Sequence, residues 1–504
     1  MKKLRDIKRL LIANRGEIAI RVMRACREMG IQTVAVFSDV DRTALHVMLA
    51  DEAYPLNGVT AAETYLDQSK ILDIARSKKI DAIHPGYGFL SENASFAERV
   101  EHAGIMFVGP SSKAIRLMGG KTSARNLAQE IGVPTISGTI EPLSSVSEGI
   151  AKAKEIGFPV LLKAAAGGGG KGMRIVSSEE EFGSAFRMAQ AEAKSAFGDD
   201  RVYLEKFVEH PRHIEIQIIG DHHGNVIHLG ERECSIQRRH QKVIEESPSP
   251  FVDNELRERL GEAAVRLARK GGYTNAGTIE FLVDEKKQFY FLEMNTRLQV
   301  EHPVTETITG LDLVKLQLEV AMGRELPIRQ ADVRATGHAI ECRIYAEDPA
   351  NNFFPSTGRL QTYRIPQGPH VRVDNGFQTG DVIPIHYDPM LAKVITWGKS
   401  RGESIETMKR VLDEFVVSGI RTTIPFCMTI LEHPAFVAGM CDTQFVEREF
   451  RPSALWQFSD NDRRAACVAA VLLKTELRQS VDLVNHNLPV SNWKKKRNET
   501  LRSS

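Results

Sequence analysis

The first 110 residues alternate between short apolar runs and amphipathic stretches of helical length, and this alternation constrains the fold more than any other feature of the sequence. Residues 9–13, 33–37, 80–83 and 105–108 are typical of short buried strands, and residues 17–29 have the spacing of a helix between the first two. Repeated strand–helix–strand units predict a parallel sheet with helices on both faces. We therefore expect an α/β chain that begins with a parallel-sheet domain.

The remaining residues have different patterns, and a length of 504 residues allows two to four domains. We expect a first domain over residues 1–110, linker helices over 111–133, a small α/β lid over 134–208, a C-terminal α+β domain over 209–454 and an extension over 455–504. Residues 213–218 show the strand pattern of the C-terminal domain: three isoleucines at alternate positions would face the core, and His213, Glu215 and Gln217 would face solvent or a cleft. In the extension, residues 462–473 have a helical pattern and residues 493–504 are expected to be frayed.

The overall charge, the apolar runs and the cysteine spacing argue against several classes of protein. A formal net charge of +1 gives no support for nucleic-acid binding or for a polybasic membrane contact. The longest apolar runs are too short for a membrane span, and the apolar piece at residues 10–13 is too short for a signal-peptide core. No two of the six cysteines are close enough for a metal-binding pair, so we expect reduced thiols and a cytoplasmic protein.

A run of four glycines at residues 167–170, followed by Lys171 and Gly172, separates strand patterns at residues 159–162 and 173–176. Glycines remove side chains, so that backbone N–H groups can approach phosphate oxygens. Gly167, Gly169 and Gly172 match the dinucleotide-binding fingerprint, but that fingerprint needs a helix where this sequence has a strand pattern. We predict a hairpin whose glycine loop closes over a triphosphate. The alternative is a flexible surface turn.

Two lysines that precede the glycine run in the sequence are candidates for phosphate contacts. Gly120, Lys121 and Thr122 resemble the end of a P-loop, but a P-loop needs a glycine at position 115, where the chain has isoleucine. We therefore reject a P-loop. Lys121 and Lys163 can still reach phosphates as point charges, although two lysines taken alone favour a solvated surface.

Residues 278–283 and 289–295 predict a hairpin that carries two glutamates. If Asp284 pairs with Phe289 around a four-residue loop, Glu280 lies directly opposite Glu293. The two carboxylates would then share one face and repel each other unless a cation lies between them. Mg²⁺ prefers such oxygen ligands, and Asn295 can add a neutral one. The alternative is one buried protonated glutamate and one exposed glutamate, but the neighbouring phenylalanines favour the metal because unpaired charge is costly in apolar surroundings.

Charged residues follow this predicted metal site directly. Arg297 could hold a small planar anion through two hydrogen bonds, and Glu301 could remove a proton from it. Residues 237–242 add further cationic donors, and the absence of interleaved aromatics argues against nucleic acid as their partner. Arg343 lies on an alternating strand pattern and faces away from its apolar neighbours. Taken singly, either arginine is more often part of a structural ion pair than a catalytic residue.

Several long motifs together resemble those of biotin carboxylases, in the same order and at matching spacing from about residue 5 to about residue 450. The motifs are IANRGEIA at residues 12–19, HPGYGFLSEN at 84–93, AAAGGGGKGM at 164–173, QRRHQK at 237–242 and EMNTRLQVEHP at 293–303. Biotin carboxylases belong to the ATP-grasp superfamily. The resemblance therefore implies an N-terminal Rossmann-like domain, a mobile lid and a mixed-sheet C-terminal domain.

The resemblance also implies a role for each candidate site residue, with ATP between the lid and the C-terminal domain. The ATP phosphates would be held by Lys121, Lys163, Gly167, Gly168, Gly169, Gly170 and Gly172, with His240 near the γ-phosphate. Glu205 and Lys206 would meet the adenine, and His213 and Gln237 the ribose. Glu280, Glu293 and Asn295 would bind Mg²⁺ or Mn²⁺. Bicarbonate would be bound by Lys242, Arg297, Gln299 and the backbone of Val300. Glu301 would be the catalytic base, and Arg343 would stabilise the biotin enolate.

The implied chemistry explains why a lid and cationic groups are needed. Bicarbonate is a poor electrophile, so ATP converts it to carboxyphosphate, which hydrolyses unless water is excluded. Phosphoryl transfer needs a metal ion and cationic donors on the developing charge. Carboxyphosphate would release CO₂ and phosphate, and the phosphate would deprotonate the ureido nitrogen of biotin.

The expected partners follow from a motif that we do not find in this sequence. We find no Ala-Met-Lys-Met type sequence of a biotinylated domain, so we expect a stand-alone subunit that receives biotin from a separate carrier protein and works with a carboxyltransferase. The family suggests a homodimer. Residues 352–359 and 387–390 look closer to acyl-CoA carboxylases, such as those of acetyl-CoA or propionyl-CoA, than to others. Two alternatives remain open: another ATP-grasp ligase of the carbamoyl-phosphate type, and a non-catalytic nucleotide-binding subunit.

Overall fold

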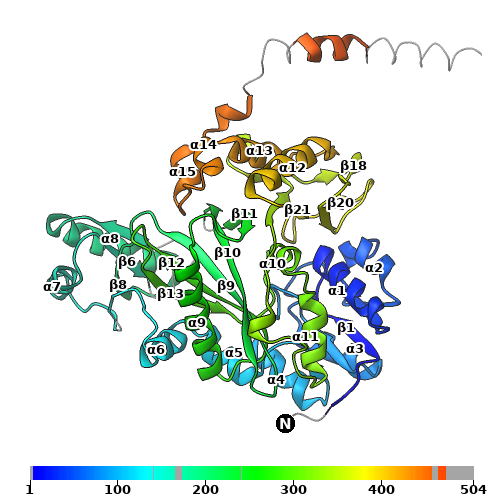
Figure 1. Ribbon diagram of the computed structural model, residues 1–504, viewed down its shortest axis with the longest axis horizontal. Coiled ribbons are helices and arrows are strands. Elements are labelled where there is room, and N and C mark those ends of the chain that lie inside the picture. The colour runs from blue at the N-terminus through cyan, green and yellow to red at the C-terminus, as the bar shows by residue number, and fades with distance from the viewer. Residues whose placement is uncertain (1–3, 140, 165–172, 240, 457–463, 473–504) are drawn as a thin grey trace, which may run out of the picture. The chain divides into compact units, whose positions relative to one another are not determined.

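The computed structural model of the protein describes residues 4–139, 141–164, 173–239, 241–456 and 464–472, and it shows the predicted α/β architecture (Figure 1). The chain forms two units, Met1–Phe450 and Arg451–Ser504. The first unit contains a five-stranded sheet, a three-stranded sheet, an eight-stranded sheet and several two-stranded pairs.

The N-terminal sheet is parallel throughout, in the order β3-β2-β1-β4-β5. Its strands are β1 (Arg9–Ile12), β2 (Gln32–Phe37), β3 (Glu52–Pro55), β4 (Ala82–His84) and β5 (Met106–Phe107), and its helices are α1 (Gly16–Glu28), α2 (Leu45–Leu49), α3 (Gln68–Ser77) and α4 (Ala94–His102). Successive residues of β1 alternate between two hydrophobic clusters: Leu10 and Ile12 pack into one and Leu11 into the other. Both faces of the sheet are therefore buried, as the continuous apolar strand pattern predicts.

The turn between β1 and α1 brings polar residues to the carboxyl end of this sheet. Gly16 has a φ of 63°, a left-handed conformation that glycine adopts without strain. Gly376, far away in the sequence, lies against the same turn, and a Cβ atom on it would be 2.8 Å from the backbone nitrogen of Glu17. This close approach places the first turn of α1 beside the C-terminal part of the unit.

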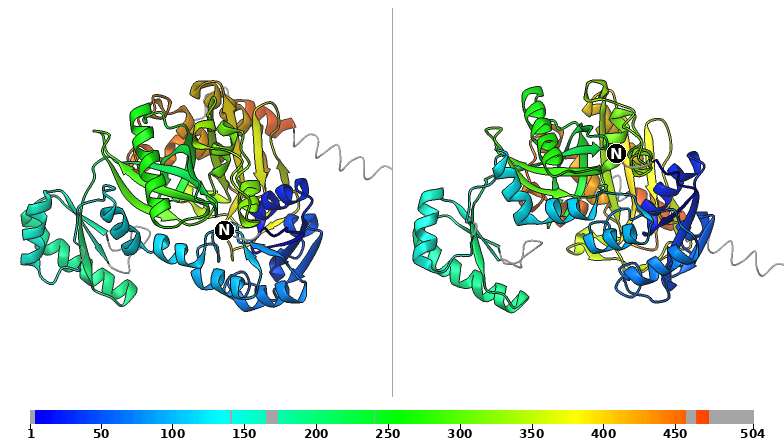
Figure 2. Two further views of the ribbon diagram at one scale, coloured as in Figure 1. Left: turned by 60° about the horizontal axis from the view of Figure 1, so that its bottom comes forward. Right: turned by 90° about the horizontal axis from the view of Figure 1, so that it is seen from below.

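The lid is a three-stranded antiparallel sheet in the order β7-β6-β8, built from β6 (Val160–Ala164), β7 (Met173–Val176) and β8 (Val202–Lys206). Helices α7 (Val146–Ile156) and α8 (Glu179–Phe197) pack on it, and Figure 2 shows both helices beside the sheet. The strand after the glycine run confirms the predicted hairpin and excludes the dinucleotide-binding fingerprint, which needs a helix there. The glycine run itself lies outside the described residues.

Two short helices precede the lid, α5 (Ser112–Gly119) and α6 (Lys121–Glu130), and Gly120 is the N-cap of α6. In Gly120-Lys121-Thr122, helix therefore follows helix, whereas a P-loop joins a strand to a helix.

The eight-stranded sheet has the order β13-β12-β9-β10-β11-β14-β21-β19. Its strands are β9 (Arg212–Gly220), β10 (Val226–Arg238), β11 (Gln241–Ser247), β12 (Asn275–Val283), β13 (Phe289–Asn295), β14 (His338–Tyr345), β19 (Val371–Asn375) and β21 (Met390–Gly398). All neighbouring strands in it pair antiparallel, so the mixed sheet that the resemblance implied is wrong for this sheet.

The two faces of β9 differ as its alternating sequence predicts. Ile214, Ile216 and Ile218 pack in the hydrophobic cluster beneath α9 (Asn254–Lys270). On the opposite face, Glu215 and Gln217 are completely buried and His213 lines a cavity, so this face lies in a cleft and not in bulk solvent. Helices α10 (His302–Thr309) and α11 (Leu313–Ala321) follow β13 in the chain.

The last part of the first unit packs four helices against β14 and β21: α12 (Arg401–Glu414), α13 (Ile424–Glu432), α14 (Pro434–Val437) and α15 (Phe445–Glu449). Three small antiparallel pairs complete it: β15 (Glu347–Asp348) with β16 (Phe354–Pro355), β17 (Gly358–Arg359) with β20 (Val382–Ile383), and β18 (Thr362–Arg364) with β22 (Val416–Ser418).

In the second unit, residues 464–472 are helical and exposed, within the range 462–473 that the sequence predicts. All six cysteines are free thiols, as expected, and every one except Cys467 is buried. Among the described residues, no helix has both the length and the apolar character needed to cross a bilayer.

Candidate functional site

The hairpin of β12 and β13 places Glu280 opposite Glu293, as the sequence predicts, but through a different register. Val283, not Asp284, pairs with Phe289, so the predicted closing pair is wrong. Asp284 belongs to the turn because its side chain accepts hydrogen bonds from the backbone N–H groups of Lys286 and Gln288.

A β-bulge corrects the register between the turn and the glutamates. Phe281 pairs with Phe291 and Glu280 pairs with Glu293, so Leu292 is the extra residue. Without the bulge, Glu293 would share the face of Phe291, which lies in the apolar core. The bulge turns Glu293 to the face of Glu280 and lets Met294 enter the core in its place.

The two glutamates differ in their surroundings. Glu280 accepts hydrogen bonds from Lys242 Nζ at 2.8 Å, Asn295 Nδ2 at 2.9 Å and Gln299 Nε2 at 3.0 Å, and it lies 3.1 Å from His213 Nε2. Burial alone would raise the pKa of Glu280, but Lys242 and His213 hold it well below its usual value. Burial and the neighbouring Glu280 raise the pKa of Glu293.

These residues fit a divalent cation. Glu280, Glu293 and Asn295 line one cavity and offer the oxygen atoms that Mg²⁺ prefers. The raised pKa of Glu293 reflects in part a repulsion from Glu280 that a cation between the two would relieve. Asn295 accepts a hydrogen bond from Arg297 Nη2 at 2.9 Å, so its side-chain oxygen already has one partner.

Lys242, near the start of β11, is the central cation of the site. Its Nζ contacts the carboxylates of Glu215, Glu280 and Glu301, the last at 2.7 Å. Burial alone would lower the pKa of Lys242, but these three carboxylates hold it well above its usual value. The ammonium group therefore stays charged and joins the predicted metal ligands to the predicted base.

Glu301 is completely buried at the N-cap of α10, and its carboxylate lies between two cations. One oxygen contacts Lys242, and the other accepts a hydrogen bond from Arg343 Nη2 at 3.0 Å. Burial opposes ionisation, yet Lys242 and Arg343 hold the pKa of Glu301 well below its usual value. The carboxylate is thus ionised, as a base must be before it accepts a proton.

A cavity of about 530 Å³ brings together residues of the lid and of the eight-stranded sheet. Of the residues predicted to hold ATP, those that line it are Lys163, Glu205, Lys206, His213 and Gln237. The side chains from the lid have partners of their own: Lys163 Nζ lies 2.9 Å from Glu205, and Lys206 Nζ donates to the carbonyls of Gly157 and Phe158. The bicarbonate candidates Lys242, Arg297, Gln299 and Val300 line the same cavity.

The other predictions for the ATP site concern Lys121, the glycine run and His240. Lys121 lines a different hollow with Glu92, Glu293 and Asn295, and the last two also line the first cavity. Gly167, Gly168, Gly169, Gly170 and Gly172 lie outside the described residues, and so does His240.

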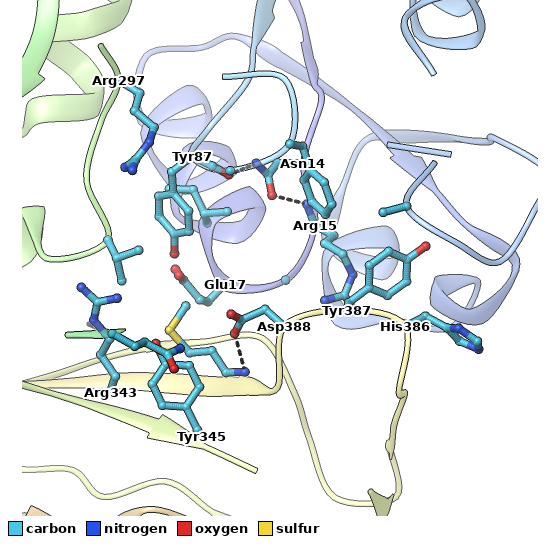
Figure 3. Close-up of a pocket in the computed structure, with 18 of the residues that line it drawn as sticks. Asn14, Arg15, Glu17, Tyr87, Arg297, Arg343, Tyr345, His386, Tyr387 and Asp388 are labelled. Atoms are coloured by element: carbon cyan, nitrogen blue, oxygen red, sulfur yellow. Dashed lines mark hydrogen bonds between the residues drawn. The ribbon is translucent and has the colours of Figure 1, made fainter. Parts of the chain in front are cut away.

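A second cavity, of about 570 Å³, lies between the N-terminal sheet and strands β14 and β21 (Figure 3). It shares four lining residues with the first cavity: Gln241, Arg297, Val300 and Arg343. Figure 3 shows the carboxylate of Glu17 directed toward the middle of this cavity, near Tyr87 and Arg343. The two cavities therefore share a wall, and Arg343 reaches both.

Glu17 lines this cavity and lies in the motif at residues 12–19, but its position in the sequence predicts no role for it. Both of its carboxylate oxygens are buried and lack a hydrogen-bond partner among the described residues. Burial raises its pKa to about 7, although Lys393 acts in the opposite direction. Asp388, in the same cavity, also has a pKa raised by burial. Neither residue has a local pattern that sets it apart from any other acidic residue.

Comparison with known protein families gives matches to three successive parts of the chain. Models of the biotin carboxylase N-terminal domain, the ATP-binding domain of the carbamoyl-phosphate synthase L chain and the biotin carboxylase C-terminal domain match residues 6–115, 120–329 and 341–448.

Individual relatives match most of the chain. Biotin carboxylase 1 of Bacillus subtilis is 54% identical over 442 residues, which cover 88% of the chain and 98% of that protein. The propionyl-CoA carboxylase alpha chain of Ruegeria pomeroyi is 48% identical over 496 residues, which cover 94% of the chain and 73% of that protein. Among solved structures, the biotin carboxylase domain dimer of Hydrogenobacter thermophilus 2-oxoglutarate carboxylase, in complex with MgADP, ADP and bicarbonate, is 46% identical with a TM-score of 0.83, covering 90% of the chain and all of that domain.

Proposed function

Because the chain belongs to the biotin carboxylase family, we propose that it is an ATP-dependent carbon–nitrogen ligase that carboxylates biotin with bicarbonate, the first half-reaction of a biotin-dependent carboxylase. One observation carries the proposal: the ionised carboxylate of Glu301 lies between Lys242 and Arg343, beside the wall shared by two cavities. A base and two cations at a shared wall suit a reaction that activates a small acid on one side and transfers it on the other.

In this proposal, the first cavity holds ATP and bicarbonate. Glu205 and Lys206 meet the adenine, His213 and Gln237 the ribose, and Lys121 and Lys163 the phosphates, together with the glycine loop. Glu280, Glu293 and Asn295 would hold Mg²⁺ or Mn²⁺, and the ion would supply positive charge for the phosphoryl transfer. Lys163 reaches a phosphate only after it leaves Glu205, and its ammonium group makes charge-assisted hydrogen bonds to either anion.

Bicarbonate is bound by Lys242, Arg297, Gln299 and the backbone of Val300, and Glu301 accepts its proton. The freed bicarbonate oxygen attacks the γ-phosphorus of ATP, and ADP leaves, which gives carboxyphosphate. Carboxyphosphate breaks into CO₂ and phosphate, and the phosphate takes the proton from the ureido nitrogen of biotin. That nitrogen then attacks CO₂ in the second cavity. Arg343 faces this cavity and stabilises the negative ureido oxygen.

The proposed reaction predicts that ADP release by the purified chain depends on both bicarbonate and biotin. With Mg²⁺ and ATP, ADP release should rise when free biotin is added, and it should stop when Mg²⁺ is chelated. A coupled assay that follows ADP measures both effects, and a reaction without bicarbonate is the control. Release that is indifferent to biotin would contradict the assignment and favour another ATP-grasp ligase. Absence of any ATP cleavage would favour a non-catalytic subunit.

The partners are a further part of the proposal: a biotin carrier protein, a carboxyltransferase that transfers the carboxyl group to an acyl-CoA such as acetyl-CoA or propionyl-CoA, and a second copy of the chain. The homodimer is supported by the dimer of the Hydrogenobacter domain. An acyl-CoA acceptor is supported by the match to the Ruegeria alpha chain, which covers 94% of this chain against 88% for the Bacillus protein.

Purification of the native complex should therefore recover a carboxyltransferase subunit active on an acyl-CoA, identified by mass spectrometry and by carboxylation of added acyl-CoA. Recovery of a transferase that carboxylates pyruvate instead would contradict the proposed acceptor and leave the first half-reaction unaffected.

A further inference from the structure

Lys393 on β21 is a completely buried lysine whose ammonium group lies just behind the catalytic run. Its Nζ donates a hydrogen bond to the backbone carbonyl of Val300 at 2.7 Å. Two carboxylates are near, Glu17 at 3.7 Å and Asp374 at 3.8 Å, and both distances exceed those of a normal hydrogen bond. The carbonyl of Val300 is therefore the principal partner of this buried cation.

Three distant parts of the chain meet at this ammonium group. Glu17 comes from the first turn of α1, Asp374 from β19, and Val300 from the run between β13 and α10. The ring of Tyr87, from the N-terminal domain, is 5.8 Å from Nζ. Lys393 is thus placed to hold the catalytic run at a fixed position relative to the N-terminal domain.

The neighbouring strand β14 carries a second cation beside Lys393. Lys393 is the cross-strand partner of Arg343, so the two cations stand side by side on β21 and β14. Arg343 holds the carboxylate of Glu301, and Lys393 holds the carbonyl of the residue just before it. The side chain of the proposed base and the peptide that carries it are therefore fixed by two adjacent cations.

The carbonyl of Val300 belongs to the planar peptide that joins Val300 to Glu301. Holding its oxygen restricts the ψ angle of Val300 and the φ angle of Glu301, which together set the direction of the Glu301 side chain. The same restriction orients the backbone of Val300, which in the proposed function contacts bicarbonate. Loss of the hydrogen bond would let this peptide rotate.

The local charges show that Lys393 is not needed as the main counter-ion of Asp374. Burial alone would raise the pKa of Asp374, but Arg372, at 2.7 Å, and Lys393 hold it far below its usual value, and Arg372 acts more strongly. Burying an ammonium group is costly unless its contacts repay it. Lys393 also offsets the burial of Glu17 and Glu341, but neither carboxylate accepts a hydrogen bond from it, and Asp374 is held by Arg372. Among the described residues, the ammonium group directs its hydrogen bond to Val300.

We propose that Lys393 is a positioning residue for bicarbonate activation: it anchors the Val300–Glu301 peptide and ties it to the N-terminal domain. The proposal rests on the proposed function, because it assigns bicarbonate to the cavity that this peptide lines.

The test compares Lys393→Met with the wild type in bicarbonate- and biotin-dependent ADP release. Methionine keeps the length of the side chain and removes the donor. We expect the KM for bicarbonate to rise about tenfold or more, because a hydrogen bond from a charged donor is lost, while the KM for ATP changes less than about twofold. Lys393→Arg, which keeps a cationic donor, should restore most of the bicarbonate affinity. Lys70→Met is the matched control, because Lys70 Nζ also donates to backbone carbonyls, those of Asn57 and Glu63, in the N-terminal domain.

The outcomes separate this proposal from the function on which it rests. Wild-type ADP release that ignores bicarbonate or biotin would overturn the function, whatever the variants do. If the wild type responds to both, an unchanged KM for bicarbonate in Lys393→Met overturns the role of Lys393, and so does an equal rise in both KM values. Should Lys393→Met not fold, the double variant Lys393→Met with Glu17→Gln removes the unbalanced carboxylate, and the same split between the KM values decides the question.

Discussion

Replacement of Glu301 by glutamine should lower the rate of bicarbonate- and biotin-dependent ADP formation by about 10²- to 10⁴-fold, the usual contribution of a general base. The amide keeps the size of the side chain and one oxygen for Lys242 or Arg343, but it cannot accept a proton. Binding of ATP should be retained, because Glu301 pairs with Lys242 and Arg343 and forms no ion pair with the part of the lid that the structure describes.

The measurement pairs a kinetic assay with a binding titration of a non-hydrolysable ATP analogue. Glu406→Gln is the control, since Glu406 makes an exposed ion pair with Lys409 and has no part in the site. Turnover near the wild-type value in Glu301→Gln would remove Glu301 from the mechanism. A loss of nucleotide binding that matches the loss of turnover would assign it a structural role.

Replacement of Lys242 by methionine should have the largest effect on stability. It leaves Glu215, Glu280 and Glu301 without their shared cation, and breaking a buried ion pair costs about 3–5 kcal/mol. We expect a clearly lower melting temperature and no detectable bicarbonate-dependent turnover. Scanning calorimetry measures the first effect and the ADP assay the second.

The pH dependence of the Lys242 variant has a definite sign. In the wild type, Lys242 helps to hold the pKa of Glu280 and of Glu301 below the usual value, so the stability from these groups is present at neutral pH and lost in acid. Without Lys242, both pKa values rise relative to the wild type, because only Arg343 and Arg232 at Glu301 and His213 at Glu280 still oppose the effect of burial. The variant therefore gains less stability than the wild type as the pH rises. The difference in melting temperature from the wild type should therefore be larger at pH 8 than at pH 5.

Lys152→Met provides the matched control, because Lys152 makes an exposed ion pair with Glu155 and such pairs contribute little. A Lys242 variant as stable as this control at pH 8 would show that the three glutamates do not depend on the ammonium group.

The parts of the fold that could be predicted are those that a local sequence pattern determines. The parallel sheet follows from apolar strands buried on both faces, and the hairpin around the glycine run follows from the strand pattern of residues 173–176. The isoleucines of β9 face the core because their spacing matches the two-residue period of a strand. Each of these predictions depends on neighbours in the sequence.

The site could be predicted only in part, because its geometry depends on contacts between distant segments. The acid pair was placed correctly although the closing pair of the hairpin was not, since a loop longer by one residue and a bulge of one residue cancel. No local signal shows that Lys242 contacts three glutamates, two of them from other strands of the sheet, or that Lys121 lies in a separate hollow. Glu17 and Lys393 could not be found, because their importance arises from burial beside residues far away in the sequence.

The bulge at Leu292 also bears on how this protein can change during evolution. Pairing of β12 with β9 runs without interruption from Asn275 to Val283, so β12 is fixed independently of the turn. Beyond the bulge, Glu293 and Asn295 take their positions from β12. Insertions and deletions in the turn at residues 284–288 can therefore accumulate while the acid pair stays in place, because the loop absorbs them without changing the pairing of Glu280 with Glu293. Aligned homologues should show length changes in this turn, and length changes between Glu293 and Asn295 should be rare.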